Sequence, residues 1–439
     1  MDKVLNVKAY LTQPHLREML MGSLAGLIVK VLAAISLFAM NVVVTRYLGA
    51  SEAGLFFLGF TLVTILATFG RVGLEQALVR FVAIESANQA FGRLRNVYGK
   101  AVLWSLITSL CITAVVWLCG DSLNRYVFRL AGFSEVLKIM VVATPIMALF
   151  VIHAHALQGL KKVSRSMLVL SVILPISLLM MALVAPTDNA VTLAWYFLAS
   201  CLLTLAIGVA MYMAVSPTVK TPEVFSSQLL LQTCMPLWMV AILHQVIQWS
   251  SQLMLGGWGS AEDVAFFATA QRTAMLTSFI LFAVNTIAAP KFAAMHAAGD
   301  SKGLEKMAIF SVRMMLVVAV PAVSFILLFP EWLMSMFGEE FRAAAPALMI
   351  LALGQFVNIA TGSVGYLLSM TGNEKKVRDN VLISGLVSIG LGVLLIPNQG
   401  VMGAAIAYAA GVASQNLLGV YQVKKQLGFN TLAFWRSVP

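Results

Sequence analysis

The stretch RYLGASEAGLFF at residues 46–57 has a counterpart in GGWGSAEDVAFF at residues 256–267. Gly49 aligns with Gly259, an acidic residue stands three positions after each glycine, and two adjacent phenylalanines close both stretches. Later features keep the same order, in the pairs Arg80-Phe81 and Lys291-Phe292, Gly92 and Gly303, and Lys161-Lys162-Val163 and Lys375-Lys376-Val377. The two halves of the chain are therefore related by an internal repeat.

The composition places both halves in a membrane. The chain is 60% hydrophobic and only 11% charged, and its mean hydropathy is +0.91, whereas a soluble domain carries about 25% charged residues. Backbone polar groups in hydrocarbon must be satisfied internally, so only helices or a closed barrel can span a bilayer. The apolar runs have the length of a spanning helix, about 20 residues, rather than the roughly 10 of a barrel strand. The sequence thus predicts an all-α polytopic membrane protein.

Twelve apolar segments are expected to span the membrane, six in each half. They are Leu24–Val44, Gly54–Leu78, Val97–Cys119, Val136–Leu157, Met167–Leu183, Val191–Val215, Leu229–Leu255, Val264–Ala289, Ile309–Phe329, Ala347–Met370, Val381–Ile396 and Val401–Val423. The predicted organisation is an amphipathic cytoplasmic N-terminus at 1–22, an N-lobe at 23–215, a cytoplasmic linker at 216–228, a C-lobe at 229–423 and a cytoplasmic tail at 424–439.

The repeat itself indicates a transporter. Because six spans separate the copies, each helix runs in the same direction as its counterpart, and the pseudo-two-fold axis lies along the membrane normal. Two similar lobes then face each other around a central cavity, and rocking of the lobes exposes that cavity to either side of the membrane.

The distribution of basic residues predicts the orientation. Of the 29 Lys and Arg, 21 belong to the termini and one set of loops, five belong to the opposite set, and the remaining three, Lys30, Arg71 and Arg272, lie inside spans. Cytoplasmic loops carry the excess of Lys and Arg. Both termini are therefore expected in the cytoplasm, and the net charge of +11 needs no nucleic-acid partner to explain it.

Several motifs resemble those of the oligosaccharide flippase family, which belongs to the multidrug/oligosaccharidyl-lipid/polysaccharide exporter superfamily. The resemblance covers nearly the whole chain. It is carried by Arg46-Tyr47-Leu48-Gly49 through Gly54-Leu55-Phe56, Gly73-Leu74, Ala77 to Ala83, Phe337-Gly338-Glu339-Glu340-Phe341 with Ala345-Pro346, and Thr371-Gly372-Asn373 with Lys375-Lys376.

This resemblance implies a function for the chain. It implies twelve helices in two lobes that move a polyprenyl-diphosphate-linked sugar from the cytoplasmic to the outer leaflet of a bacterial inner membrane, for O-antigen, capsule or exopolysaccharide synthesis. The implied partners are the lipid-linked glycan, membrane lipids and a polysaccharide polymerase or glycosyltransferases. No cofactor is expected, and coupling to a proton or sodium gradient stays open.

Lys30, Arg71, Glu75 and Arg272 are ionisable side chains inside predicted spans, where each needs a partner or an aqueous cavity. Lys30 shares a helix face with Asn41, and Arg71 and Glu75 are four residues apart on the second span. One interpretation is a cationic floor that binds a diphosphate, with Glu75 as a coupling residue. The alternative is an internal ion pair, or extension of the Lys30 and Arg71 side chains to the cytoplasmic interface.

Arg272 is the strongest candidate for a contact with a substrate anion. It lies about eight residues into its span, and no acidic residue in the spans of the second half can pair with it. The alternative is hydrogen bonding to backbone carbonyls of a broken helix.

The seventh predicted span carries a polar stripe. His244, Gln248, Ser251 and Gln252 fall on one helical face, bordered by Gln245 and Trp249. Amides, hydroxyls and aromatic rings suit a glycan, and interhelical hydrogen bonding explains them equally well. Gln355 and Asn358 on the tenth span are candidates for the same cavity.

Histidine offers one more candidate for coupling, because its side chain titrates near neutral pH. His153 is the candidate, with His155 as its neighbour, and a histidine hydrogen-bonded at the interface is the simpler explanation. The two are only two residues apart and cannot share one helix face, so no metal site is expected from them.

Two other functions compete with the flippase. A cation-coupled multidrug antiporter of the same fold would need buried acids, and Glu75 is the only acid well inside a predicted span. A membrane glycosyltransferase or polymerase would need a large external domain, and the external loops are short. No phosphate-binding P-loop and no catalytic constellation is found, so an enzyme is not expected.

Overall fold

The computed structural model describes residues 14–217, 223–433 and 435. Most of the expected amphipathic N-terminus, part of the linker and the last few residues of the tail lie outside these residues. Every regular element in the described ranges is a helix. The prediction of an all-helical chain is confirmed.

The first half of the chain contains the elements from α2 to α9. They are α2 (Pro14–Arg71), α3 (Leu74–Ala87), α4 (Phe91–Leu123), η1 (Asn124–Phe128), α5 (Phe133–Val141), α6 (Ala143–Gly159), α7 (Val163–Ser171), α8 (Ile173–Val184) and α9 (Ala190–Met213).

The second half contains the elements from α10 to α17. They are α10 (Ser227–Trp258), α11 (Ala261–Met275), η2 (Leu276–Ser278), α12 (Phe279–Ala297), α13 (Ser301–Leu328), α14 (Pro330–Ser335), η3 (Glu339–Ala344), α15 (Ala345–Ala360), α16 (Val364–Met370) and α17 (Glu374–Leu427).

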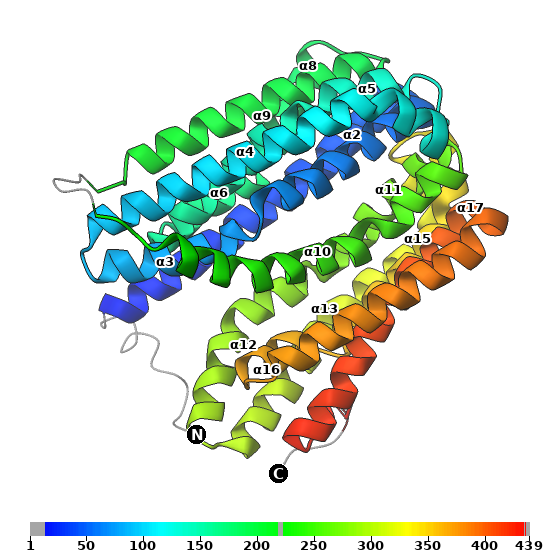
Figure 1. The fold of residues 1–439 in the computed structure, drawn as a ribbon. Coiled ribbons are helices and arrows are strands. Elements are labelled where there is room, and N and C mark those ends of the chain that lie inside the picture. Colours follow the sequence, from blue (N-terminus) through cyan, green and yellow to red (C-terminus); the bar gives the residue numbers. More distant parts are fainter. Residues whose placement is uncertain (1–13, 218–222, 434, 436–439) are drawn as a thin grey trace.

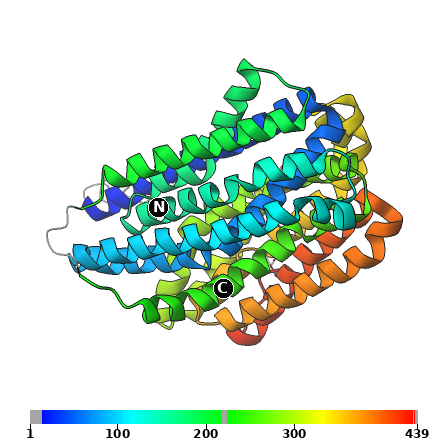
Figure 2. The same ribbon diagram turned by 45° about the horizontal axis from the view of Figure 1, so that its top comes forward.

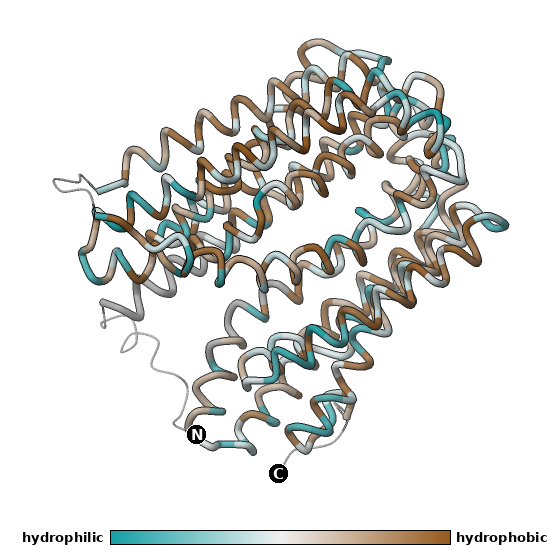
Figure 3. The backbone as a smooth tube through the Cα atoms, viewed as in Figure 1, coloured by the Kyte–Doolittle hydropathy of each residue, from teal (hydrophilic) through white to brown (hydrophobic). Residues whose placement is uncertain are grey.

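Within the described residues, ten helical segments are long and apolar enough to cross a membrane. Hydrophobic residues dominate along the lengths of the helices and hydrophilic ones gather near their ends (Figure 3). Large apolar side chains such as Leu118, Val317 and Leu386 are at least 70% exposed, which suits a surface that contacts lipid. The chain is a multi-pass membrane protein.

Two of these segments are divided by glycine. The 58-residue α2 contains Gly49, at φ 70° and ψ 176°, and the 54-residue α17 contains Gly400, at φ 52° and ψ −125°. Glycine adopts positive φ without the steric cost that a β-carbon imposes. The first two predicted spans therefore follow each other across a single non-helical residue, and so do the last two.

Other predicted spans are interrupted where hydropathy gives no sign of it. The second span was expected to run from Gly54 to Leu78, but α2 ends at Arg71, and Val72 and Gly73 both have positive φ. The fourth, fifth, eighth and tenth spans are likewise split, at Val142, at Val172, at η2 and at Thr361–Ser363. These breaks correct the expectation of continuous helices.

The elements of the two halves form two groups. In Figure 1, α2 to α9 lie together at the upper left, and α12 to α17 lie at the lower right. The long helices of both groups run roughly alongside one another, as the rotated view also shows (Figure 2). Helices α10 and α11 lie between the groups, and both pack against α2.

The groups approach each other at the right of Figure 1. At one end of the bundle Arg46 and Ala50, which flank Gly49, are hydrogen-bonded to Met336 and Glu340 of the second half. We call this the Gly49 end. Gly54 of α2 lies directly against the backbone of α11 there, and a β-carbon at this position would overlap the carbonyl oxygen of Ala261. Only glycine permits so close an approach of the two halves.

Candidate functional site

Arg272 of α11 reaches across to the first half of the chain. Its Nη1 donates to Oδ1 of Asn41 at 2.5 Å. Its guanidinium carbon lies 4.1 Å from the ring centroid of Phe57 and 5.4 Å from that of Phe60. A cation over an aromatic face is stabilised by about 0.5–2 kcal/mol. All three of these partners belong to α2, so this side chain links the halves.

Asn41 is oriented for this contact. The side chain is 2% exposed, and its Nδ2 donates to the carbonyl oxygen of Leu37 at 2.7 Å. Because the amide nitrogen is used within α2, the amide oxygen is left to accept from Arg272. Arg272 itself is half-buried. Among the described residues, the guanidinium thus bonds a side chain of the other half rather than backbone carbonyls of a broken helix.

A second junction between the halves surrounds Thr68. Its hydroxyl oxygen accepts from Nη2 of Arg71 at 2.9 Å and from Nε2 of Gln245 at 2.6 Å, and it donates to Thr64 O at 3.0 Å. Trp249 Nε1 then donates to Oε1 of Gln245 at 3.0 Å. Gln245 and Trp249, which border the predicted polar stripe, therefore connect to the predicted cation Arg71 through one buried hydroxyl.

Arg71 and Glu75 are brought together by the break in the second span. Arg71 is the last residue of α2, and Glu75 lies in the first turn of α3. Arg71 Nε is 3.4 Å from Glu75 Oε2, at side-chain exposures of 10% and 8%. A carboxylate in the first turn also interacts favourably with the helix dipole. The predicted contact between these two side chains is present, although no continuous helix joins them.

The two histidines of α6 have different surroundings. His153 is 5% exposed, its ring packs edge-on against Tyr98 at 5.6 Å, and its Nδ1 bonds the carbonyl oxygen of Leu149 at 2.7 Å. His155 is half-buried, and its Nδ1 bonds the carbonyl oxygen of Val151 at 2.9 Å. Each histidine therefore bonds a backbone carbonyl of its own helix, as the simpler explanation expects.

The polar stripe of α10 is divided between different environments. His244 is exposed and Gln248 is half-buried, with its Nε2 3.3 Å from Met275 Sδ. Gln252 is fully buried and donates to the carbonyl oxygen of Phe57 at 3.1 Å. Gln252 thus supports the contact between the halves, while His244 is accessible.

The predicted pair on the tenth span belongs to a polar cluster within the second half. Gln355 Oε1 accepts from Ser278 Oγ at 2.6 Å and from Asn358 Nδ2 at 3.1 Å. Gln355 Nε2 lies 3.5 Å from the hydroxyl of Tyr408 on α17. Asn358 is half-buried, and so is Lys30, which precedes Asn41 on α2 by eleven residues.

Sequence reasoning missed the apolar and hydroxyl parts of this site. The ring of Phe57 packs against the guanidinium of Arg272, and the hydroxyl of Thr68 bonds both Arg71 and Gln245. Neither residue type stands out within an apolar span, because phenylalanine and back-bonded threonine are ordinary there. Only the polar residues carried a signal that a sequence could offer.

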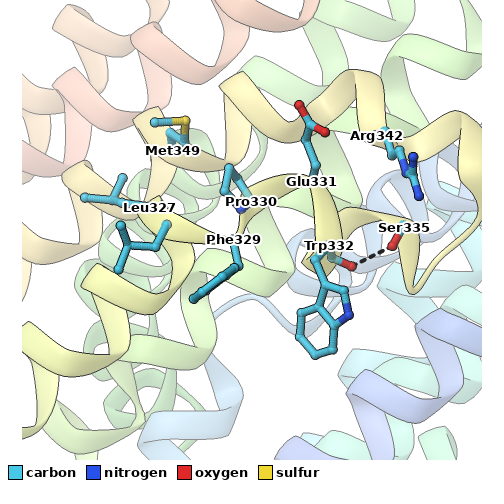
Figure 4. A pocket seen from close by; sticks show the side chains of 9 residues that line it. Leu327, Phe329, Pro330, Glu331, Trp332, Ser335, Arg342 and Met349 are labelled. Carbon is cyan, nitrogen blue, oxygen red and sulfur yellow. Dashed lines mark hydrogen bonds between the residues drawn. The ribbon is translucent and has the colours of Figure 1, made fainter.

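A separate cavity of ≈ 560 Å³ lies near the Gly49 end, where α13, α14, η3 and α15 meet. Figure 4 shows the rings of Phe329 and Trp332 on one side of this segment and Glu331 on the other. The described lining consists of Leu327, Leu328, Phe329, Pro330, Glu331, Trp332, Ser335, Arg342 and Met349. It includes none of the candidate residues.

Known proteins share this sequence pattern and this fold. Residues 16–296 match the family described as polysaccharide biosynthesis protein, and residues 236–397 match the MatE family. A probable low-salt glycan biosynthesis flippase of Haloferax volcanii, Agl15, is 24% identical over 376 residues, which cover 85% of this chain and 76% of that protein.

Two solved structures have a similar fold. The inward-closed conformation of the lipid II flippase MurJ is 15% identical, with a TM-score of 0.74 over 92% of this chain and 87% of that one. The inward-facing conformation of a multidrug resistance MATE transporter is 18% identical, with a TM-score of 0.73 over 95% and 100%. These confirm the resemblance seen in the sequence. The chain therefore belongs to the polysaccharide biosynthesis protein family of membrane transporters and has the fold that MATE transporters share with MurJ.

Proposed function

We propose that this chain is a flippase that moves a polyprenyl-diphosphate-linked oligosaccharide from the cytoplasmic to the outer leaflet by alternating access. Membership in the polysaccharide biosynthesis family supports this proposal, as does similarity to a protein described as a probable glycan flippase. The fold common to this chain and a lipid II flippase is consistent with a lipid-linked substrate.

The observation that carries the proposal is the sign of the charge between the halves. Within the part of the chain that the structure describes, Arg272 contacts α2 without an acidic partner, and Arg71 lies at the second junction beside Glu75. Lys30 adds a further cation on α2. Guanidinium groups bind phosphate oxygens with two parallel hydrogen bonds. Among these described residues three cations stand against one acid, Glu75, and this excess of positive charge favours an anionic substrate such as a diphosphate.

The proposed topology has twelve crossings in two lobes of six. Gly49 and Gly400 each divide one of the ten described segments into two helices, of lengths suited to a bilayer. We expect the chain to lie in the inner (cytoplasmic) membrane of a bacterium. The excess of basic residues in one set of loops then predicts that both termini lie in the cytoplasm. The Gly49 end then faces outward. The N-lobe at 23–215, the linker at 216–228 and the C-lobe at 229–423 follow from the same division.

Within this proposal the candidate residues have separate roles. Arg272, Lys30 and Arg71 attract the diphosphate, and the exposed His244 and half-buried Gln248 contact sugar hydroxyls. The half-buried Gln245, Trp249 and Asn358 border the same path, while the buried Gln252 supports the contact between the halves. In the described conformation Arg272 and Arg71 are already engaged by neighbouring side chains, so the substrate has to exchange with those contacts. Such exchange would couple binding to movement of the lobes.

A multidrug antiporter is the second candidate, because residues 236–397 match the MatE family. An antiporter for cationic drugs would need acids in its cavity, and Glu75 is paired with Arg71. The two functions therefore differ in the sign of the transported molecule.

A deletion strain tests the proposal. Loss of the gene should accumulate lipid-linked oligosaccharide on the cytoplasmic face of the membrane, and the wild-type gene should restore export. A parallel measurement of sensitivity to cationic drugs separates the two candidates. A deletion strain that exports polysaccharide normally and is more sensitive to cationic drugs would favour the antiporter and overturn the flippase proposal.

A further inference from the structure

Two charged side chains connect the halves at the Gly49 end. Arg46 Nε donates to the carbonyl oxygen of Met336 at 2.7 Å. In the opposite sense, the backbone N–H of Ala50 donates to Oε1 of Glu340 at 2.6 Å. The second-half partners both belong to the turn between Ser335 and Arg342, two residues labelled in Figure 4.

Each charged side chain contacts the end of a helix, and its charge is of the sign that the helix dipole favours at that end. Gly49 is non-helical, so Ala50 begins the second segment of α2 and its N–H has no partner within that segment. Met336 is the C-terminal cap residue of α14. A carboxylate is stabilised at a helix N-terminus and a cation at a C-terminus. Each half thus supplies a charged cap to a helix of the other half.

The N–H group of Ala50 and its equivalent in the second copy of the repeat are capped by carboxylates from different places. In the second copy, Ser260 occupies the position of Ala50 and Asp263 the position of Ala53. There the N–H of Ser260 donates to Oδ2 of Asp263 at 2.9 Å, inside the same helix. In the first copy Ala50 and Ala53 have no capping group, and the carboxylate comes from Glu340. The equivalent N–H is therefore capped locally in one half and from the partner half in the other.

The turn that carries Glu340 is firmly held in the second half. Phe337 and Phe341 are at most 1% exposed, and Phe341 packs edge-on against Phe266 at 5.4 Å. Phe337 also meets Phe38 of α2 edge-on at 5.4 Å. Glu340 is thus fixed to its own half, so its bond to Ala50 can persist only while the two halves stay together.

We propose that the contacts of Glu340 with Ala50 and of Arg46 with Met336 form a latch that holds the Gly49 end closed. This inference rests on the proposed alternating access, because the latch must open when the lobes rock apart. Both charged side chains are exposed, so water can replace the lost bonds on opening. The latch therefore favours the state in which the Gly49 end is closed but still permits opening.

Distance measurements between two spin labels test the latch. The labels are placed at Asp188→Cys in the first half and Gln399→Cys in the second, both exposed, in a full-length chain whose four native cysteines are replaced by alanine. The purified protein is studied in lipid nanodiscs without substrate. Glu340→Gln should raise the ratio of long to short distances about three- to tenfold, in line with loss of one charged cap. Arg46→Gln should act in the same direction, and the two together should exceed either alone.

The neighbouring ion pair provides matched controls. Glu339→Gln removes the same charge as Glu340→Gln from the same turn, and Arg342→Gln removes the same charge as Arg46→Gln, but the contact between Glu339 and Arg342 lies within the second half. They should leave the distances unchanged. Equal distributions in the latch variants and the parent would overturn the proposal, and so would equal shifts in latch and control variants. Arg46→Gln gives an independent reading if Glu340→Gln does not yield folded protein.

This measurement is separable from the test of function. If deletion of the gene leaves export intact while Glu340→Gln still shifts the distances, the flippase function fails and the latch stands. If export depends on the gene and the distances do not move, the latch alone fails.

Discussion

Arg272 and Asn41 are joined by a 2.5 Å hydrogen bond although 231 residues separate them in the sequence. The bond runs from α11 in the second half to α2 in the first. The strongest candidate for binding an anion is therefore also a contact between the halves. Any substrate anion that takes the guanidinium from Asn41 weakens that contact at the same time.

Replacements of Arg272 should distinguish the contribution of its charge to export from the contribution of its paired hydrogen bonds. We expect Arg272→Ala to abolish export while protein abundance stays near normal, and Arg272→Gln to behave in the same way. Arg272→Lys should retain partial export, because an ammonium keeps the attraction but loses the paired hydrogen bonds of a guanidinium. Export is measured as surface polysaccharide and abundance by immunoblot. Normal export by Arg272→Ala would assign the residue a structural role.

If Arg272→Ala exports normally, the cationic site has to depend on Lys30 and Arg71. The three positions neutralised together then provide the deciding variant. Export by that triple variant would remove the case for an anionic substrate.

The membrane topology gives a second prediction. Reporter fusions at Lys161, Lys302 and Lys376 should indicate the cytoplasm, because 21 of the 29 basic residues belong to that side. Fusions at Asp188, Glu262 and Glu339 should indicate the outside. An external signal at Lys161 or Lys376 would reverse the assignment, and the Gly49 end would then face the cytoplasm.

Thr68 gives a third prediction, which concerns stability. Thr68→Val keeps the shape of the side chain but leaves the donors of Arg71 and Gln245 without their shared acceptor. A buried donor that loses its acceptor costs about 1–3 kcal/mol. Thermal unfolding of the purified protein should therefore begin at a lower temperature.

The control is Thr64→Val. The hydroxyl of Thr64 donates to Phe60 O within its own helix at 2.8 Å, so its loss should change the unfolding temperature little. Equal unfolding temperatures for the two variants would mean that the junction at Thr68 contributes nothing measurable.

The parts of the fold that depend on hydropathy and repetition could be predicted from the sequence. Apolar runs gave the membrane helices, and the match between Gly49 and Gly259 indicated two related halves. The break at Val72 could not be predicted, because valine rarely adopts the positive φ of 49° that it has there. Such a backbone is set by packing: Gly73 lies against the backbone of α10 at Trp238.

The candidate site divides in the same way. Arg272 stood out because a cation deep in an apolar span needs a partner, and the predicted spans of its own half contain no acidic residue. Its partners, Asn41 and Phe57, lie in the other half, and helical periodicity says nothing about contacts between distant helices. The capping of Ala50 by Glu340 was hidden for the same reason.

Asn41→Asp gives the last prediction, and it separates holding the halves together from binding the substrate. The new carboxylate would lie where Oδ1 of Asn41 now accepts from Arg272, and it would convert a neutral contact into an ion pair. Charge-assisted hydrogen bonds are roughly twice as strong as neutral ones, so the contact between α2 and α11 should tighten. The same carboxylate would compete with a diphosphate for the guanidinium. We therefore expect export to fall while the unfolding temperature stays equal or rises, a combination that a damaged fold does not produce. Asn41→Ala, in contrast, should lower the unfolding temperature by freeing a half-buried guanidinium. An Asn41→Asp variant that exports as well as the wild type would show that Arg272 does not need to leave Asn41 during transport, and the proposed exchange with substrate would be wrong.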